Sequence, residues 1–295
     1  MIKPLKFIVL VAALAGFAFS SFAGNIVMGG SDILKPYIAD TVKALAKKDR
    51  FEVDIQMNGS YTAFDEMKSG ASDVAIVAIP KGTSIPEGYV AYPIAYQVAV
   101  VIVNAVNPVE DISTDQLFNI FSKNAQNHAE TWEQAGVKSP ALRNILAIST
   151  GFSDNIVVEL FKYSAIKGTN LGPWVAIENN RQVIYNMVRA NNSAIAVVGK
   201  LTDKNMLKVL GVSNSDGGKT GNYAFKPDIN SIFNGDYPMV LPFYVVCQKD
   251  KIAKAKPLIK ILLGDELAEK IDASDFYSTP KDSRKKSIFE LDISK

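Results

Sequence analysis

Short β-branched segments alternate with amphipathic helical segments along the first part of the chain. Residues 25–28, 53–57 and 72–79 show the alternating or unbroken apolar patterns that predict strands. Between them, residues 36–46 and 62–68 repeat apolar side chains at helical spacing. This β-α-β-α-β order is typical of an α/β lobe in which helices flank a mainly parallel sheet. The alternation therefore predicts an α/β fold.

The length of the chain predicts two such lobes. The protein has 295 residues, and a single hydrophobic core rarely grows beyond about 250–300 residues. Two apolar runs of similar character, residues 98–103 and 240–247, are the expected crossovers between the lobes. Lobe one would then comprise residues 24–100 plus 243–295, and lobe two residues 104–238.

The first 23 residues have the pattern of a cleavable export signal. Lys3 and Lys6 form a short basic start, and residues 7–19 are an uncharged apolar run. Small residues at 21 and 23 predict cleavage before Gly24. A membrane anchor is the alternative, but a spanning helix needs about 20 apolar residues. We therefore expect residues 1–23 to be a signal peptide that directs the protein out of the cytoplasm.

Charge and rare residues narrow the chemistry. The chain carries 32 basic and 30 acidic side chains, so no broad electrostatic attraction to nucleic acid is expected. A single cysteine, Cys247, and a single histidine, His128, cannot build a structural zinc site. His128 has no nucleophile turn near it, so serine-type hydrolysis is not expected. We predict no enzyme activity, no metal and no cofactor, and a buried Cys247 within an apolar run.

Three strand-to-helix turns, at residues 30–35, 59–62 and 150–155, share one design. Each places small or hydroxyl residues where backbone N–H groups are free at the start of a helix, which favours anion binding. Ordinary helix capping by Ser and Thr is the alternative. The candidate ligand-binding residues of these turns are Ser31, Lys35, Gly59, Ser60, Thr62, Thr150, Gly151 and Ser153.

Several segments, in order along the chain, resemble the PstS-like family of periplasmic phosphate-binding proteins. The opening loop at 30–36 and the second loop at 59–60 carry this likeness. Further similar segments lie at residues 70–75, 101–109, 117–121 with Trp132, 194–198 and 235–239. The resemblance implies a two-lobed periplasmic binding protein, the Venus-flytrap fold, whose lobes close on a ligand. It also implies a periplasmic monomer that hands a small inorganic anion, phosphate or a related oxyanion, to an ABC permease in the inner membrane.

The ligand pocket of the family is matched only in part. The resemblance assigns anion-binding backbone amides to Leu34 and Lys35, and it retains the pocket serine as Ser60. The aspartate that reads the phosphate proton aligns with Ala78, and the arginine aligns within residues 147–149, where none occurs. Lys35 could replace the positive charge of the missing arginine, or it could be an exposed residue of the first helical turn. A scaffold, an adhesin or a sensor on the same fold is the alternative function.

Overall fold

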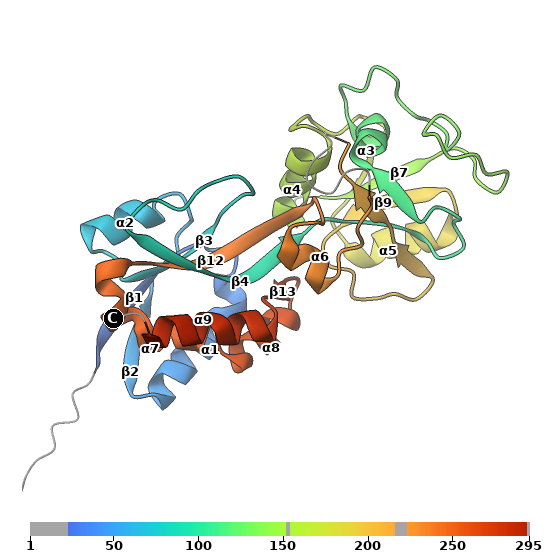
Figure 1. Cartoon of the computed structure of the whole chain (residues 1–295). Coiled ribbons are helices and arrows are strands. Elements are labelled where there is room, and N and C mark those ends of the chain that lie inside the picture. Colours follow the sequence, from blue (N-terminus) through green and yellow to red (C-terminus); the bar gives the residue numbers. More distant parts are fainter. Residues whose placement is uncertain (1–22, 152–153, 216–222, 294–295) are drawn as a thin grey trace, which may run out of the picture.

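In the computed structural model, residues 23–151, 154–215 and 223–293 are described, and the predicted signal peptide lies almost entirely outside them. The described chain forms two α/β lobes side by side (Figure 1). The first lobe contains a six-stranded sheet in the order β13-β4-β12-β3-β1-β2. Its strands are β1 (Ala23–Gly30), β2 (Phe51–Ile55), β3 (Val74–Ala78), β4 (Tyr89–Val98), β12 (Val240–Gln248) and β13 (Tyr277–Ser278).

Helices cover both faces of the first sheet, though unequally. On one face, apolar side chains of α1, α7 and α8 pack with the sheet into one core that includes Ile38, Leu258 and Leu267. On the other face, Met67 of α2 packs on β3 and β12 in a smaller core. The first-lobe helices are α1 (Lys35–Lys48), α2 (Ala63–Ser69), the short 3-10 helix η2 (Lys249–Lys251), α7 (Ile252–Leu262), α8 (Asp265–Asp272) and α9 (Lys281–Ile293).

The second lobe contains a five-stranded sheet in the order β10-β5-β9-β7-β8 and a two-stranded sheet, β11-β6. Its strands are β5 (Val100–Asn104), β6 (Asp111–Ser113), β7 (Leu146–Thr150), β8 (Ala176–Glu178), β9 (Ala194–Val198), β10 (Leu207–Val209) and β11 (Gly211–Ser213). Its helices are α3 (Thr114–Phe121), α4 (Asn155–Ala165), α5 (Arg181–Ala190) and α6 (Ile229–Asn234). One continuous core, which includes the fully buried Trp132, fills this lobe.

The predicted α/β architecture is confirmed, but the expectation of mainly parallel sheets is wrong, because each sheet is mixed and β13-β4 and β10-β5 are among its antiparallel pairs. The strands of the β-α-β units pair in parallel, as β1 does with β2 and β3, and as β7 does with β8 and β9. The crossover strands then add antiparallel pairs, β12 to β3 and β4 in the first sheet and β5 to β9 in the second. At β12 and at β5 the chain arrives from the other lobe and enters the sheet from the opposite end. These two strands therefore run antiparallel to their neighbours.

The two crossovers lie side by side where the lobes meet, with Val98 paired to Val240, and Ala99 adds two hydrogen bonds to the segment before β12. The Ala99 N–H donates to the Met239 carbonyl at 3.1 Å, and the Ala99 carbonyl accepts from the buried Tyr237 hydroxyl at 2.8 Å. The chain leaves the first sheet at Val98 and joins the second at Val100. The residue boundaries predicted for the lobes stay a prediction, and this position of the crossing supports them.

Local sequence features account for several elements. Ser113 and Gln116 form the capping box at the start of α3, each accepting a hydrogen bond from the backbone N–H of the other. Cys247 is fully buried in β12, as expected of a small apolar side chain. Within the described residues, no helix has the length and apolar character needed to cross a membrane.

Candidate anion-binding site

The opening loop connects β1 to α1 and forms part of the predicted site. Ser31 is buried; its N–H donates to the Ile76 carbonyl at 2.6 Å, and its Oγ accepts from the Ile33 N–H at 3.3 Å. The Lys35 N–H donates to the Asp32 carbonyl at 3.2 Å. The N–H of Leu34, the residue that caps α1, donates to no described residue. One predicted backbone donor is therefore available, while those of Ser31 and Lys35 are already used.

The second loop, between β2 and α2, lies directly against the opening loop. The Gly59 N–H donates to the Gly30 carbonyl at 2.8 Å, and the Lys35 ammonium lies 3.4 Å from the Met57 carbonyl. Lys35 is therefore half-buried between the two loops, and the alternative of a freely exposed lysine is wrong. Ser60 Oγ accepts from the Ala78 N–H at 3.1 Å, which leaves the hydroxyl proton free to donate.

Thr62 contributes less to the second loop than the sequence suggested. Its hydroxyl donates to Glu66 Oε1 at 2.7 Å, one turn further along α2, and makes no capping bond at the start of that helix. The structure thus brings Leu34, Lys35 and Ser60 together at one end of the first sheet, while the Thr62 side chain is used within its own helix.

The third loop connects β7 to α4 in the second lobe. Thr150 and Gly151 are buried at the end of β7, and the Gly151 N–H donates to the Glu178 carbonyl at 3.0 Å. A β-carbon on Gly151 would lie only 2.4 Å from the Asn179 side chain, so this loop packs tightly on the segment before α5. Ser153 lies outside the described residues. The backbone N–H groups of Gly59 and Gly151, like those of Ser31 and Lys35, therefore already donate to carbonyls within the protein.

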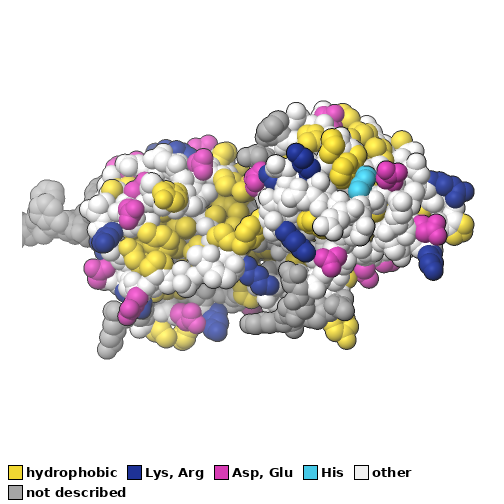
Figure 2. Space-filling model, turned by 90° about the horizontal axis from the view of Figure 1, so that it is seen from above, with side chains coloured by type: hydrophobic (Ala, Val, Ile, Leu, Met, Phe, Trp, Pro, Cys, Tyr) yellow, Lys and Arg dark blue, Asp and Glu magenta, His cyan; other side chains and the backbone are white. Residues whose placement is uncertain are grey.

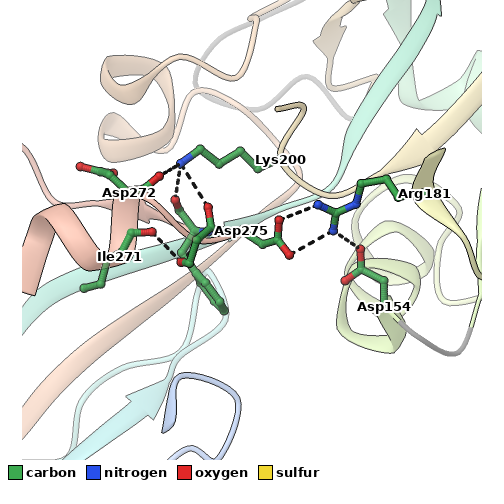
Figure 3. Close-up of polar contacts among 8 residues, drawn as sticks. Asp154, Arg181, Lys200, Ile271, Asp272 and Asp275 are labelled. Carbon is green, nitrogen blue, oxygen red and sulfur yellow. Dashed lines mark hydrogen bonds and ion pairs between the residues drawn. The ribbon is translucent and has the colours of Figure 1, made fainter. Parts of the chain in front are cut away.

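An arginine that the sequence analysis did not select lies beside the third loop. Arg181 is the first residue of α5, and its Nη2 atom is 3.1 Å from Asp154 Oδ2. Its Nη1 and Nη2 atoms also donate to the two carboxylate oxygens of Asp275 at 2.6 and 3.1 Å. Figure 3 shows the guanidinium between these two carboxylates. Because Asp275 follows α8 in the first lobe, Arg181 joins the two lobes.

The charges in this cluster are partly removed from water. Hydrogen bonding to Asp275 raises the pKa of Arg181, which stays positively charged. Burial raises the pKa of Asp154 above its ordinary value, although the neighbouring arginine opposes this shift. Burial, followed by the charges of Asp275 and Asp154, also raises the pKa of Tyr37 on the first turn of α1. The Tyr37 ring also packs edge-to-face on Phe276, the neighbour of Asp275, with 5.5 Å between the ring centroids, so the start of α1 lies close to this cluster.

Lys200 makes a second connection between the lobes. It follows β9, and its ammonium donates to the carbonyls of Asp272 and Phe276, each at 2.7 Å. These carbonyls lie at the end of α8 and just beyond it, where a positive charge is favoured by the helix dipole. Lys200 therefore holds the segment that carries Asp275 (Figure 3).

A groove of about 740 Å³ lies near the same junction, between α4 and the return crossover. Its lining is largely apolar and includes Pro80, Leu160, Tyr163 and Leu241. Figure 2 shows hydrophobic side chains gathered across the junction of the two lobes. Lys81 and Lys167 also line it, but none of the predicted site residues in the described chain does, so the groove lies apart from the candidate site.

The ion pairs could not be found from sequence motifs, yet one signal was present. Arg181 begins a helix that has no acidic residue in its first turn. A positive charge at that position opposes the helix dipole, so it suggests a partner from elsewhere in the fold. The partner Asp275 lies 94 residues away along the chain, and nothing in the local sequence identifies it.

Comparisons with known proteins identify the same class of binding protein. A family model described as a PBP superfamily domain matches residues 20–266. Protein SphX of Synechococcus elongatus is 25% identical over 264 residues, which cover 83% of this chain and 76% of that protein.

Two solved structures share the fold. One is a possible phosphate-binding protein from Planctomyces limnophilus (TM-score 0.69, 18% identity, 92% of this chain and 98% of that one). The other is PstS from Borrelia burgdorferi (TM-score 0.69, 14% identity, 87% and 99%).

The fold and these matches define a two-lobed solute-binding protein. The chain belongs to the PBP superfamily, because the family model spans most of its length. Within that family its structure is PstS-like, which confirms the resemblance seen in the sequence.

Proposed function

We propose that this protein is an exported solute-binding protein that captures a small oxyanion, most simply phosphate, between its lobes. We further propose that it works in the periplasm and delivers the anion to an ABC permease of the inner membrane. One observation carries the proposal: the Leu34 N–H, which donates to no described residue, and the Ser60 hydroxyl lie on adjacent loops, and α1 begins close to the Arg181 cluster, where Tyr37 packs on Phe276. The Planctomyces limnophilus relative is described as a possible phosphate-binding protein, which supports this choice of anion.

The donors on the first lobe suit an anion. Helix α1 has 14 residues, so its dipole places partial positive charge at the Leu34 N–H. Ser60 accepts from the Ala78 N–H and therefore keeps its own proton available to donate. Lys35 lies between the two loops and adds a full positive charge. These groups favour any small oxyanion and do not by themselves select phosphate.

Discrimination between phosphate and sulfate is expected to be poor. Phosphate carries a proton near neutral pH and sulfate does not, so selectivity requires an acceptor for that proton. Ala78 stands where the family has its aspartate, and it offers no side-chain acceptor. The two anions should therefore compete on similar terms for the site.

Calorimetric titration tests both statements. The chain from residue 24 onward is titrated with phosphate, sulfate, molybdate and tungstate. Ser60→Ala should weaken oxyanion binding by about 1–3 kcal/mol, because it removes a donor to a charged group. Ser69→Ala is the matched control, since Ser69 lies at the other end of α2 and bonds only within that helix. Equal affinities for both variants would exclude Ser60 from the site, and strong phosphate selectivity would refute the role given to Ala78.

One observation favours the alternative of a scaffold, an adhesin or a sensor. Arg181 is already paired with two carboxylates of the protein, and this cluster carries a net negative charge. A scaffold or an adhesin, or a sensor of a different ligand, would release no heat with any of the four oxyanions. Binding of any of them at physiological concentration would instead support transport.

A further inference from the structure

The two carboxylates around Arg181 play different geometric roles. Asp154 belongs to the same lobe as the arginine and contacts only Nη2, at 3.1 Å. Asp275 comes from the other lobe and contacts Nη1 and Nη2 with both oxygens, at 2.6 and 3.1 Å. The edge of the guanidinium that recognises oxyanions in a bidentate manner is therefore covered by Asp275 alone.

The cluster lies where the arginine could reach a bound anion. Asp154 closes the third loop, its N–H donating to the Gly151 carbonyl at 3.1 Å. A β-carbon on Gly199 would lie 3.5 Å from Arg181 Nη2 and 3.2 Å from Asp154 Oδ2, so Gly199 leaves the room that both side chains occupy. Tyr37, two residues beyond Lys35, is affected by the same charges. Arg181 thus lies beside the second-lobe loop and is joined to the first lobe through Asp275, whose neighbour Phe276 packs on Tyr37 of α1 with 5.5 Å between the ring centroids.

We propose that Arg181 is the anion-binding cation of this protein, and that the Asp275 carboxylate occupies its bidentate edge until an oxyanion displaces it. This inference rests on the proposed function and adds a residue and a competitor that neither the sequence motifs nor the family resemblance supplied. Asp275 presents two oxygens in a plane, as an oxyanion does. Its exchange for a ligand keeps the guanidinium paired at every stage.

The competition between Asp275 and an anion for Arg181 lowers the fraction of ligand-free molecules in which the arginine can bind. If Arg181 is available in only a fraction of the ligand-free molecules, the apparent dissociation constant rises by the inverse of that fraction. The Arg181 and Asp275 side chains are 28% and 32% exposed, so their ion pair is neither fully buried nor freely solvated. We expect about one molecule in ten or fewer to have the arginine free, which weakens binding about tenfold or more.

Titration of inorganic phosphate into four variants tests the proposal. Asp275→Asn should bind phosphate about tenfold more tightly than the unmodified protein, because the amide is a weaker competitor for the guanidinium. Arg181→Gln should bind about 10- to 100-fold more weakly, and Arg181→Lys should regain only part of that loss, since lysine keeps the charge and loses the fork. Asp282→Asn, which removes an exposed carboxylate of the first lobe, should leave the affinity unchanged.

Each outcome of these titrations either supports or refutes the proposal. Tighter binding by Asp275→Asn but not by Asp282→Asn supports the proposal, including the case in which only Asp275→Asn binds phosphate. If the unmodified protein binds and Asp275→Asn is no tighter, the competitor role is refuted while the proposed function stands. If Arg181→Gln binds as well as the unmodified protein, Arg181 is not a ligand. If neither the unmodified protein nor Asp275→Asn binds phosphate or sulfate, both the inference and oxyanion capture are refuted.

Discussion

The last residue of β1 offers a sharp test of how the opening loop is held. Gly30 has a φ of +101°, and its carbonyl accepts from the second loop. A β-carbon added there would lie 2.0 Å from the Ile76 carbonyl oxygen and 2.6 Å from the Ile76 nitrogen. Both atoms belong to the backbone of β3, so no side-chain rotation can make room. Gly30→Ala must therefore push β1 away from β3 at the position from which the loop starts.

The magnitude follows from two contributions. The left-handed conformation costs a non-glycine residue roughly 1–2 kcal/mol. Separating the strands breaks the 2.6 Å hydrogen bond from Ser31 to Ile76, and an unsatisfied buried backbone group costs about 1–3 kcal/mol. We expect Gly30→Ala to lose about 3–5 kcal/mol, a large share of the roughly 5–15 kcal/mol that stabilises a typical protein.

Urea denaturation followed by far-ultraviolet circular dichroism measures this loss. Gly82→Ala is the matched control, because Gly82 has a similar φ of +89° but nothing within 4 Å of the added carbon. The control should lose only the conformational cost, about 1–2 kcal/mol. If the two variants unfold at the same urea concentration, the close contact with Ile76 does not determine the cost and the reasoning is refuted.

Three further predictions concern other buried groups. Burial raises the pKa of the Cys247 thiol to about 12, so a thiol reagent at pH 8 should modify it only after unfolding; rapid reaction of the folded protein would contradict this. Asn104→Ala should cost about 2–3 kcal/mol in urea denaturation, because its amide donates to the Val188 and Arg189 carbonyls at the end of α5. Burial raises the pKa of Asp154, so its ionised form costs folding free energy at neutral pH, and this cost disappears as the pH falls through the raised value. The free energy of unfolding of Asp154→Asn, relative to that of the unmodified protein, should therefore be higher at pH 7 than at pH 4. An equal difference at both pH values would argue against the raised pKa.

Much of the secondary structure was predictable because its signals are local. The strand and helix periods, the proline at the start of α1 and the capping box of α3 depend on residues within one or two turns of each other. The position of Ser60 next to the opening loop also followed, because consecutive β-α turns of a parallel sheet lie at the same edge.

Which backbone donors remain free was not predictable. The N–H groups of Ser31, Gly59 and Gly151 all lie in turns that favour anion binding, yet each donates to a carbonyl of another segment. Their partners come from β3, from the end of β1 and from β8, so the outcome depends on how strands distant in sequence pack together.

The sequence by itself determined the alternation of strands and helices, the export signal expected at residues 1–23 and the anion-favouring turns, because these rest on local composition and spacing. Only the tertiary structure decided which of those turns keep a free donor. It also decided that Arg181 lies between Asp154 and Asp275, since Asp275 is 94 residues from its partner and in the other lobe. Pairing of charges depends on distance in space, which a linear pattern does not contain.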